Sequence, residues 1–186
     1  MNNKKIERLW KQILEEIGED PNRNGLLETP KRIAKMYEEI FAGYTTTPPK
    51  VTTFAREQSQ GLIIDIGYYY SVCEHHGIPF FGNYYYGYIP DETIIGASKI
   101  GRVVDYFSAR MQIAERLCAD VVGYIESKTK PLGSILIMNG RHLCKEMRGL
   151  KKHNSPFESI EARGILLTNK DGCKDEFMSR IMRRIV

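Results

Sequence analysis

The sequence lacks the features that would place the protein in a membrane, outside the cell or along a nucleic acid. Its 186 residues contain no apolar run of membrane-spanning length, and no signal-peptide pattern follows the lysine-bearing N-terminus. The four cysteines do not have disulfide-framework spacing, and the net charge is only +4. Repeats and low-complexity tracts are absent as well. We therefore expect a cytoplasmic protein of one or two domains that binds an anionic small molecule and neither nucleic acid nor membrane.

What the sequence does contain is a concentration of metal-binding residue types. Three of its four histidines and two of its four cysteines lie within residues 73–76 and 142–144. Cys73 and His76, three positions apart, together with Cys144 would supply three N/S ligands and leave the fourth tetrahedral position of a zinc ion open, as in catalytic sites. His75 and His142 would then remain as imidazoles suited to move protons near neutral pH.

Each of these residues taken alone has a more ordinary interpretation, because a buried cysteine is usually a small hydrophobic residue and a lone histidine rarely binds metal. Their concentration in two segments favours the metal site. The other two cysteines have no histidine nearby. We expect Cys118, inside a helical pattern, to lie in the core and Cys173 to be an exposed thiol.

Hydrophobic periodicity predicts an N-terminal helical region over residues 1–48, and we expect the candidate metal site to belong to a second domain over residues 49–186. The second helix of the first region is expected to begin with Thr29 as N-cap and Pro30 at the first helical position. Arg32 and Lys35 lie on its polar face, where a solvated position is the default expectation.

Strands are predicted over residues 51–56, 62–72 and 80–89, and the second of these ends directly at Cys73. We expect the tyrosines of the third strand on the sheet surface or at a subunit contact. Asn139-Gly140 indicates a hairpin between residues 134–138 and 141–147, which would place His142 and Cys144 on one face of a strand. A last strand is expected over residues 162–168.

Two helices are predicted between these strands. Ser98 is typical of an N-cap, so that Lys99 and Arg102 join it at a helix N-terminus, an arrangement that favours an anion such as phosphate. The next helix, over residues 112–127, carries Glu115, which alone signals little.

Five motifs together give the chain a family resemblance. They are T-P-K-R-I-A-K (29–35), C-E-H-H (73–76), I-G-A-S-K-I-G-R (95–102), Q-I-A-E-R (112–116) and H-L-C-K-E-M-R-G (142–149). In this order the chain resembles the GTP cyclohydrolase I family, zinc enzymes that open the guanine ring of GTP, release formate and give 7,8-dihydroneopterin triphosphate.

The resemblance implies a role for each matching residue. It implies Zn²⁺ on Cys73, His76 and Cys144, a catalytic acid–base pair of His75 and His142, and recognition of the guanine edge by Glu115. The residues that match the family's triphosphate-binding set are Arg32, Lys35, Ser98, Lys99, Arg102 and Arg148.

The resemblance also implies an α+β tunnelling fold, in which an antiparallel sheet is backed by helices and preceded by an N-terminal helical hairpin. It implies a homodecamer with active sites between subunits. Three positions depart from the family pattern: Ala114 replaces a usual glutamine, residues 155–159 replace a serine- and threonine-rich run, and Tyr84–Tyr86 occur where a histidine is common.

Three alternatives stay open. The substrate could be a modified or different purine nucleotide. A deazaguanine nitrile reductase of the same fold would use a cysteine nucleophile and NADPH and would not need the C-E-H-H metal site. A zinc-stabilised nucleotide-binding assembly protein would not need both extra histidines.

Overall fold

A computed structural model describes residues 1–57 and 61–185, and its contacts divide the chain into the units Met1–Thr47 and Pro48–Val186. The assignment of catalysis to the second unit stays a prediction. None of the helices in the described ranges is both long and apolar enough to cross a bilayer.

The first unit is a pair of helices, α1 (Asn3–Glu16) and α2 (Thr29–Ile40), followed by the short 3₁₀ turn η1 (Ala42–Tyr44). The Asn2 side chain accepts a hydrogen bond from the Lys5 amide at 3.0 Å and so caps α1. The prediction for α2 was wrong in one detail, because Thr29 lies inside the helix and the N-cap is Glu28, without a side-chain cap. The Trp10 and Tyr37 rings pack edge to face between the helices.

The second unit is built on a five-stranded sheet in the order β5-β2-β3-β6-β7. Every neighbouring pair is antiparallel except β2 and β5. The strands are β2 (Ile63–Cys73), β3 (Pro79–Ile89), β5 (Met111–Gln112), β6 (Gly133–His142) and β7 (Phe157–Arg163). A separate two-stranded sheet pairs β1 (Thr53–Ala55) with β4 (Thr93–Ile95).

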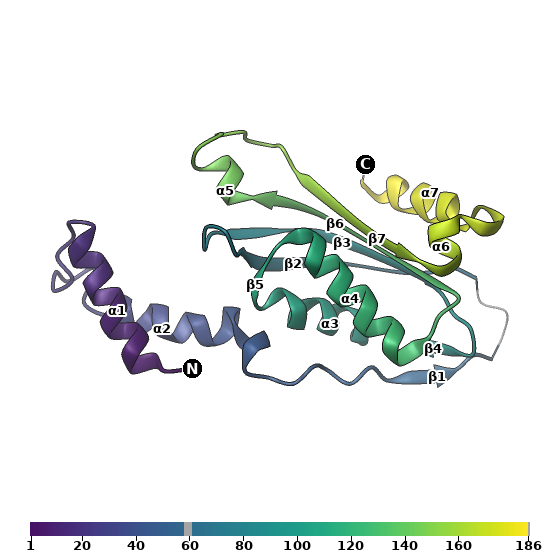
Figure 1. Cartoon of the computed structure of the whole chain (residues 1–186), viewed down its shortest axis with the longest axis horizontal. Coiled ribbons are helices and arrows are strands. Elements are labelled where there is room, and N and C mark those ends of the chain that lie inside the picture. The colour runs from purple at the N-terminus through teal and green to yellow at the C-terminus, as the bar shows by residue number, and fades with distance from the viewer. Residues whose placement is uncertain (58–60, 186) are drawn as a thin grey trace. The chain divides into compact units, whose positions relative to one another are not determined.

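Helices cover both faces of the larger sheet (Figure 1). On one face lie α3 (Ser98–Ser108) and α4 (Ala114–Thr129). On the other lie α6 (Gly164–Thr168) and α7 (Cys173–Ile185), joined by the turn η2 (Lys170–Gly172). The short α5 (Leu143–Glu146) follows β6 directly. The expected α+β architecture is therefore the observed one.

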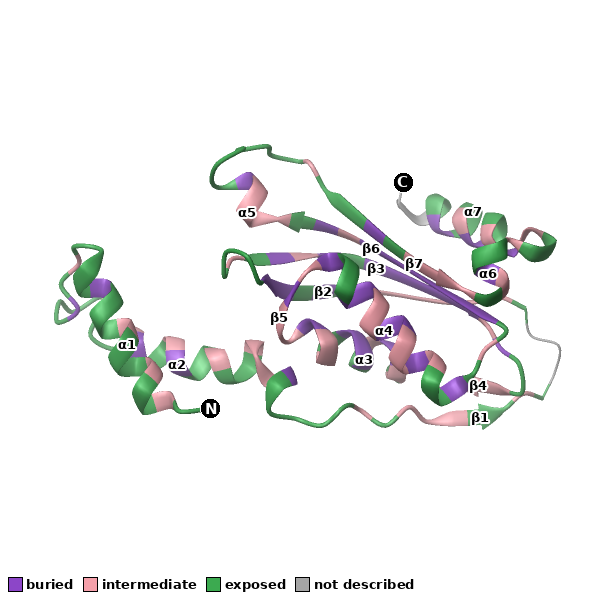
Figure 2. Ribbon diagram, in the orientation of Figure 1, coloured by how far each residue is buried: buried purple, intermediate pink, exposed green. Residues whose placement is uncertain are grey.

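Burial on both faces explains why the prediction for the tyrosines was wrong. Tyr84, Tyr86 and Tyr88 enter the core beneath α3 and α4, while Tyr85 enters the core beneath α7. Alternate residues of a strand point to opposite faces, so a sheet covered on both sides buries both sets. Figure 2 shows the resulting run of buried residues along β3 and β6. The hydroxyl of Tyr88 accepts a hydrogen bond from the Ile95 amide at 2.9 Å, which satisfies it inside the core.

The hairpin prediction at Asn139-Gly140 was wrong as well, because β6 runs through both residues and pairs Gly140 with Gly82. These glycines permit close approach rather than a turn: a Cβ on Gly82 would lie 2.0 Å from the Asn139 carbonyl oxygen. The register of β3 with both neighbouring strands continues through Gly82 without a bulge. The expected last strand also stops early, at Arg163, where Gly164 adopts φ +57° and starts α6.

Two glycine substitutions are expected to change stability in opposite directions. Gly82→Ala should destabilise the protein by about 1–3 kcal/mol, because backbone atoms of β6 occupy the space that the methyl group needs. Gly123→Ala, inside α4, should stabilise it by about 0.5–1 kcal/mol, because its Cβ meets only Arg163 side-chain atoms at ordinary contact distance. Thermal unfolding of both variants beside the parent tests this, and an unchanged midpoint for Gly82→Ala would refute the close-approach argument.

Candidate active site

Cys73, His76 and Cys144 meet at one end of the large sheet and can hold a metal ion. Their nearest ligand atoms all lie within 4.8 Å of one another. The Cys73 and Cys144 Sγ atoms are 3.9 Å apart, and Cys73 Sγ lies 3.8 Å from His76 Nδ1. Two thiolates about 2.3 Å from a tetrahedral ion would themselves be separated by about 3.8 Å. The donor set therefore fits a tetrahedral ion in both chemistry and spacing.

Strand order explains how residues so distant in sequence converge. β2 and β6 flank β3, and Cys73 at the end of β2 leads into the turn that starts β3. The Cys73 carbonyl accepts the Gly77 amide at 2.9 Å, and Gly77 has φ +65°, which closes the turn tightly. The expectation that Cys144 shares a strand with His142 was wrong, since Cys144 lies in α5.

The short helix α5 is fixed by an ion pair with the strand before it. Glu146 is 3% exposed, and its carboxylate accepts hydrogen bonds from the Arg141 guanidinium, the closest of them from Nε at 3.0 Å and Nη2 at 2.5 Å. A buried carboxylate that lost this partner would be costly, so the pair holds the helix that carries Cys144.

His142 is held between two aromatic rings beside this group. Its imidazole stacks on Phe80 at 4.7 Å and meets Phe157 edge to face at 5.4 Å. Its Nδ1 lies 3.4 Å from the Gly140 carbonyl oxygen, and donation along that line leaves Nε2 as a proton acceptor. Burial lowers the pKa of His142 below its ordinary value, although the Gly140 carbonyl and Glu115 oppose this shift. Neutral imidazole is the form that can accept a proton.

A cavity of about 220 Å³ joins the three metal-ligating residues to His75, His142 and the first turn of α4. Glu115 and Ala114 line it from that turn. Sequence reasoning assigned no site role to five further lining residues: Phe80, Gln112, Ile113, Lys145 and Phe157. Lys145 directly follows Cys144 in a motif that had been recognised, whereas Phe157 lies in the segment noted only as a departure from the family pattern.

The predicted phosphate-binding residues lie elsewhere in the chain. Among the described residues that line the cavity, none comes from α3, although Ser98 and Lys99 form its first turn. Ser98 is not the N-cap as expected, since Ala97 occupies that position. Arg148 is exposed beyond α5, and its charge lowers the pKa of the Cys144 thiol, against the larger rise caused by burial. Arg102 also lies in α3, and the last two members, Arg32 and Lys35, belong to the first unit.

The other two cysteines differ in outcome. Cys118 is 1% exposed in the core beneath α3 and α4, as predicted. Cys173 is buried rather than exposed, because it packs beside Phe177 and its Sγ donates to the Ile165 carbonyl at 3.1 Å. Neither belongs to the metal-binding group.

Comparisons with known proteins identify similar sequences along almost the whole chain. The family model described as GTP cyclohydrolase I matches residues 6–182. GTP cyclohydrolase 1 of Streptococcus mutans is 42% identical over 91% of this chain and 90% of its own length. That of Thermoanaerobacter pseudethanolicus is 41% identical over 97% of both. A solved archaeosine synthase QueF-Like in the apo form aligns with a TM-score of 0.48 at 16% identity, over 57% of this chain and 97% of its own.

Replacement of one thiol is expected to abolish tight metal binding. Cys144→Ser should weaken Zn²⁺ or Co²⁺ binding by more than the roughly 10- to 100-fold loss that outer-shell changes cause, because a hydroxyl is a poor substitute for a thiolate. Competition against a chromophoric chelator measures the affinity. Cys173→Ser is the matched control, since a serine hydroxyl can donate to the same Ile165 carbonyl. Equal metal affinity in both variants would remove Cys144 from the ligand set.

Proposed function

Because the chain belongs to the GTP cyclohydrolase I family, we propose that it hydrolyses the guanine imidazole ring of GTP, releases formate and forms 7,8-dihydroneopterin triphosphate. The observation that carries this proposal is the cavity in which Cys73, His76 and Cys144 lie beside His142 and Glu115. One wall of the cavity can hold a metal ion, and another offers a carboxylate to a base.

Zinc is the ion that we assign to the metal-binding group. Two thiolates and an imidazole are soft and borderline ligands, which favour zinc over magnesium or calcium. When bound there, zinc supplies a Lewis acid that lowers the pKa of water toward neutrality. The cysteines must be reduced to act as ligands, so we place the protein in the cytoplasm.

Proton transfer is assigned to His142 and His75. Addition of water to C8 of guanine requires a proton at N7. His142 Nε2, which is left as an acceptor when Nδ1 donates to Gly140, takes a proton from the water and then delivers it to N7. The Phe80 ring limits rotation of that imidazole. The first water opens the ring, a second releases C8 as formate, and the freed amine condenses with the rearranged ribose and loses one water. His75 lines the same cavity and is the second proton carrier.

Glu115 is assigned to the base. A carboxylate can accept two hydrogen bonds from the N1–H and the 2-amino group of guanine, which adenine does not offer in that arrangement. Its neighbour Ala114 is buried and has no polar side-chain atom to add a further bond. Discrimination between purines therefore depends on Glu115, and a modified purine nucleotide is the alternative substrate.

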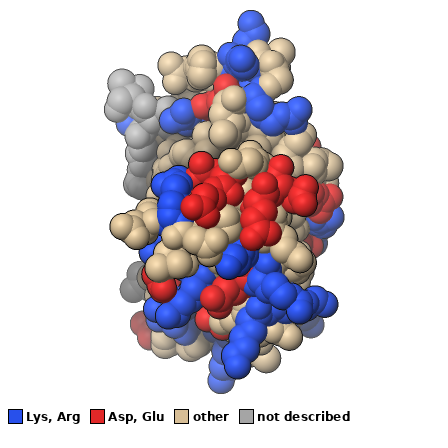
Figure 3. Space-filling view, turned by 90° about the vertical axis from the view of Figure 1, so that its left-hand side faces the viewer, with Lys and Arg blue, Asp and Glu red and all other residues tan. Residues whose placement is uncertain are grey.

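The triphosphate is assigned to Arg32, Lys35, Ser98, Lys99, Arg102 and Arg148. Charge-assisted hydrogen bonds from several cations suit a group that carries close to four negative charges. Figure 3 shows acidic side chains beside and between the basic ones on one face. Such mixed charge suits a compact triphosphate better than a long nucleic acid. Because the described cavity lining contains no residue of α3, we propose that Ser98, Lys99 and Arg102 complete the site of another subunit in a homodecamer.

Incubation with GTP tests the activity directly. The protein should release formate and form a pterin that fluoresces after oxidation, and a chelator should stop both reactions until Zn²⁺ is restored. ATP should give neither product, because it lacks the donors that Glu115 recognises. Formate release without the metal would overturn the zinc assignment. NADPH-dependent reduction of a nitrile would instead favour the reductase alternative.

His142→Ala separates an enzyme from a nucleotide-binding assembly protein. We expect turnover to fall by roughly 100- to 10,000-fold, the usual contribution of a positioned acid–base group, while Zn²⁺ and GTP still bind. His153→Ala is the matched control, since His153 is exposed in the loop after α5. Turnover and equilibrium binding of GTP should be measured for both. If His142→Ala retains parental turnover, the assigned proton path is wrong.

A further inference from the structure

We propose that Arg116 is a positioning residue that fixes the Cys73–His76 turn relative to the first turn of α4. This inference rests on the proposed function, because its consequence is the spacing between the metal ligands and Glu115. Arg116 directly follows Glu115 in α4 and does not line the cavity described above. Its role is therefore to act through other residues.

The contact that carries the proposal joins Arg116 to Glu74. The Arg116 Nη2 atom donates to the Glu74 carboxylate in a close ion pair. Glu74 lies between Cys73 and His75, so a contact to its side chain constrains the orientation of the metal-binding turn. The same Nη2 is 3.3 Å from the Met111 carbonyl oxygen. One guanidinium thus bridges the turn after β2 and the strand that leads into α4.

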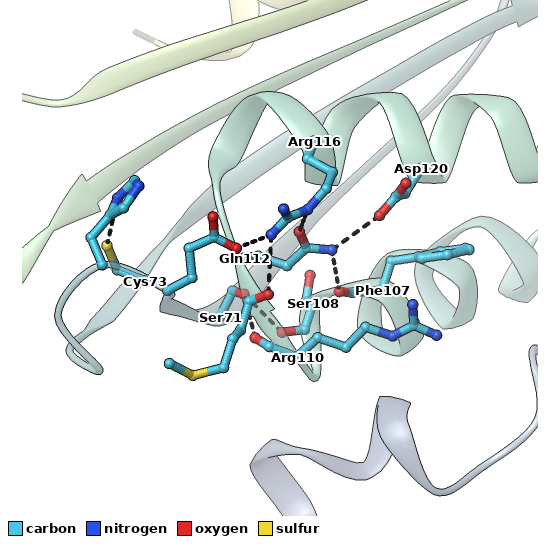
Figure 4. A network of polar contacts seen from close by, with 11 residues as sticks. Ser71, Cys73, Phe107, Ser108, Arg110, Gln112, Arg116 and Asp120 are labelled. Carbon is cyan, nitrogen blue, oxygen red and sulfur yellow. Dashed lines mark hydrogen bonds and ion pairs between the residues drawn. The ribbon is translucent and has the colours of Figure 1, made fainter.

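The side chain of Gln112 contacts the Arg116 guanidinium and fixes its position, as Figure 4 shows. Its side chain is buried, and its Oε1 accepts a hydrogen bond from Arg116 Nε at 2.9 Å. Its Nε2 donates to the Phe107 carbonyl at 3.2 Å and to Asp120 Oδ2 at 3.1 Å. Hydrogen bonds therefore fix both the Nε2 and the Oε1 atom of the Gln112 side chain. The fixed Oε1 in turn determines the orientation of the planar Arg116 guanidinium.

The backbone supports the same connection. The Glu74 amide donates to the Gln112 carbonyl at 3.0 Å, and Gln112 pairs with Cys73 in the parallel β2–β5 register. Beyond Glu74, however, the turn is supported mainly by its own hydrogen bonds to Cys73. The Arg116–Glu74 pair is a side-chain constraint on the part of the turn that carries His75 and His76.

Stability does not explain this arrangement. The Arg116 and Glu74 side chains are 43% and 33% exposed, and ion pairs with such exposure contribute little to folding. Catalysis is far more sensitive to position, since a displacement of about 1 Å can cost roughly 100-fold in rate. A contact that contributes little to the free energy of folding can therefore have a large effect on kcat.

The test compares Arg116→Met, Arg116→Lys, Glu74→Gln and the double variant Arg116→Met/Glu74→Gln. We expect Arg116→Met to lower kcat by roughly 10- to 100-fold with a much smaller change in the KM for GTP. Lysine should restore part of the loss, because it keeps the charge without the fork. The double variant should be no slower than the slower single variant, since both changes break one contact.

A readout independent of turnover is the ligand-field absorption of the Co²⁺-loaded protein. Arg116→Met and Glu74→Gln should shift this spectrum in the same way, because both release the turn that carries two metal ligands. Arg163→Met is the matched control: Arg163 is 38% exposed and pairs with Glu126 near the other end of α4. Its kcat, KM and Co²⁺ spectrum should match those of the parent.

The outcomes are distinct. Parental kcat and an unchanged Co²⁺ spectrum in Arg116→Met would overturn the proposal, as would additive losses in the double variant. If the parent protein failed to act on GTP, the proposed function would fail, while the Co²⁺ spectra would still decide whether Arg116 positions the turn. Thermal unfolding and size-exclusion chromatography of each variant would identify any loss of fold or assembly.

Discussion

Two thiols and an imidazole are brought together by the β2–β3–β6 pairing, and the rest of the site depends on that convergence. Burial and the neighbouring Cys73 raise the pKa of the Cys144 thiol, so the chain alone disfavours two adjacent thiolates. A bound cation reverses this penalty by favouring the ionised form of both sulfurs. The two adjacent thiols would therefore ionise more readily beside a divalent cation. The register of the strands determines where these thiols lie.

The same strands serve the core and the chemistry. Phe80 is fully buried beneath α3 and α4, yet its ring stacks on His142. The apolar packing that stabilises β3 thereby sets the orientation of an imidazole at its end. Gln112 has a comparable double position, because it pairs with Cys73 and supports the first turn of α4. Substitutions in the core near this edge should consequently change the orientation of the side chains in the site.

Sequence reasoning predicted the metal-binding group because histidine and cysteine are rare in this chain and five of the eight lie in two short segments, 73–76 and 142–144. The helix periods and the strand before Cys73 were also predictable. The course of β6 was not, since Asn139-Gly140 has the composition of a turn and only its partner Gly82 shows that a close strand approach requires glycine. The contact between Phe157 and His142 could not be predicted from the spacing of these residues in the sequence.

The division of the candidate site has a physical rationale. Within one chain, the described cavity brings together the candidate metal ligands, the two histidines and Glu115, to which we assign action on the base. The cations of α3 stand apart, at a helix N-terminus whose partial positive charge repels them when no anion is bound. If another subunit supplies these cations, the polyanion relieves that repulsion only where two subunits meet. Binding energy from the triphosphate would then be available for orienting the base against groups that are already held rigidly.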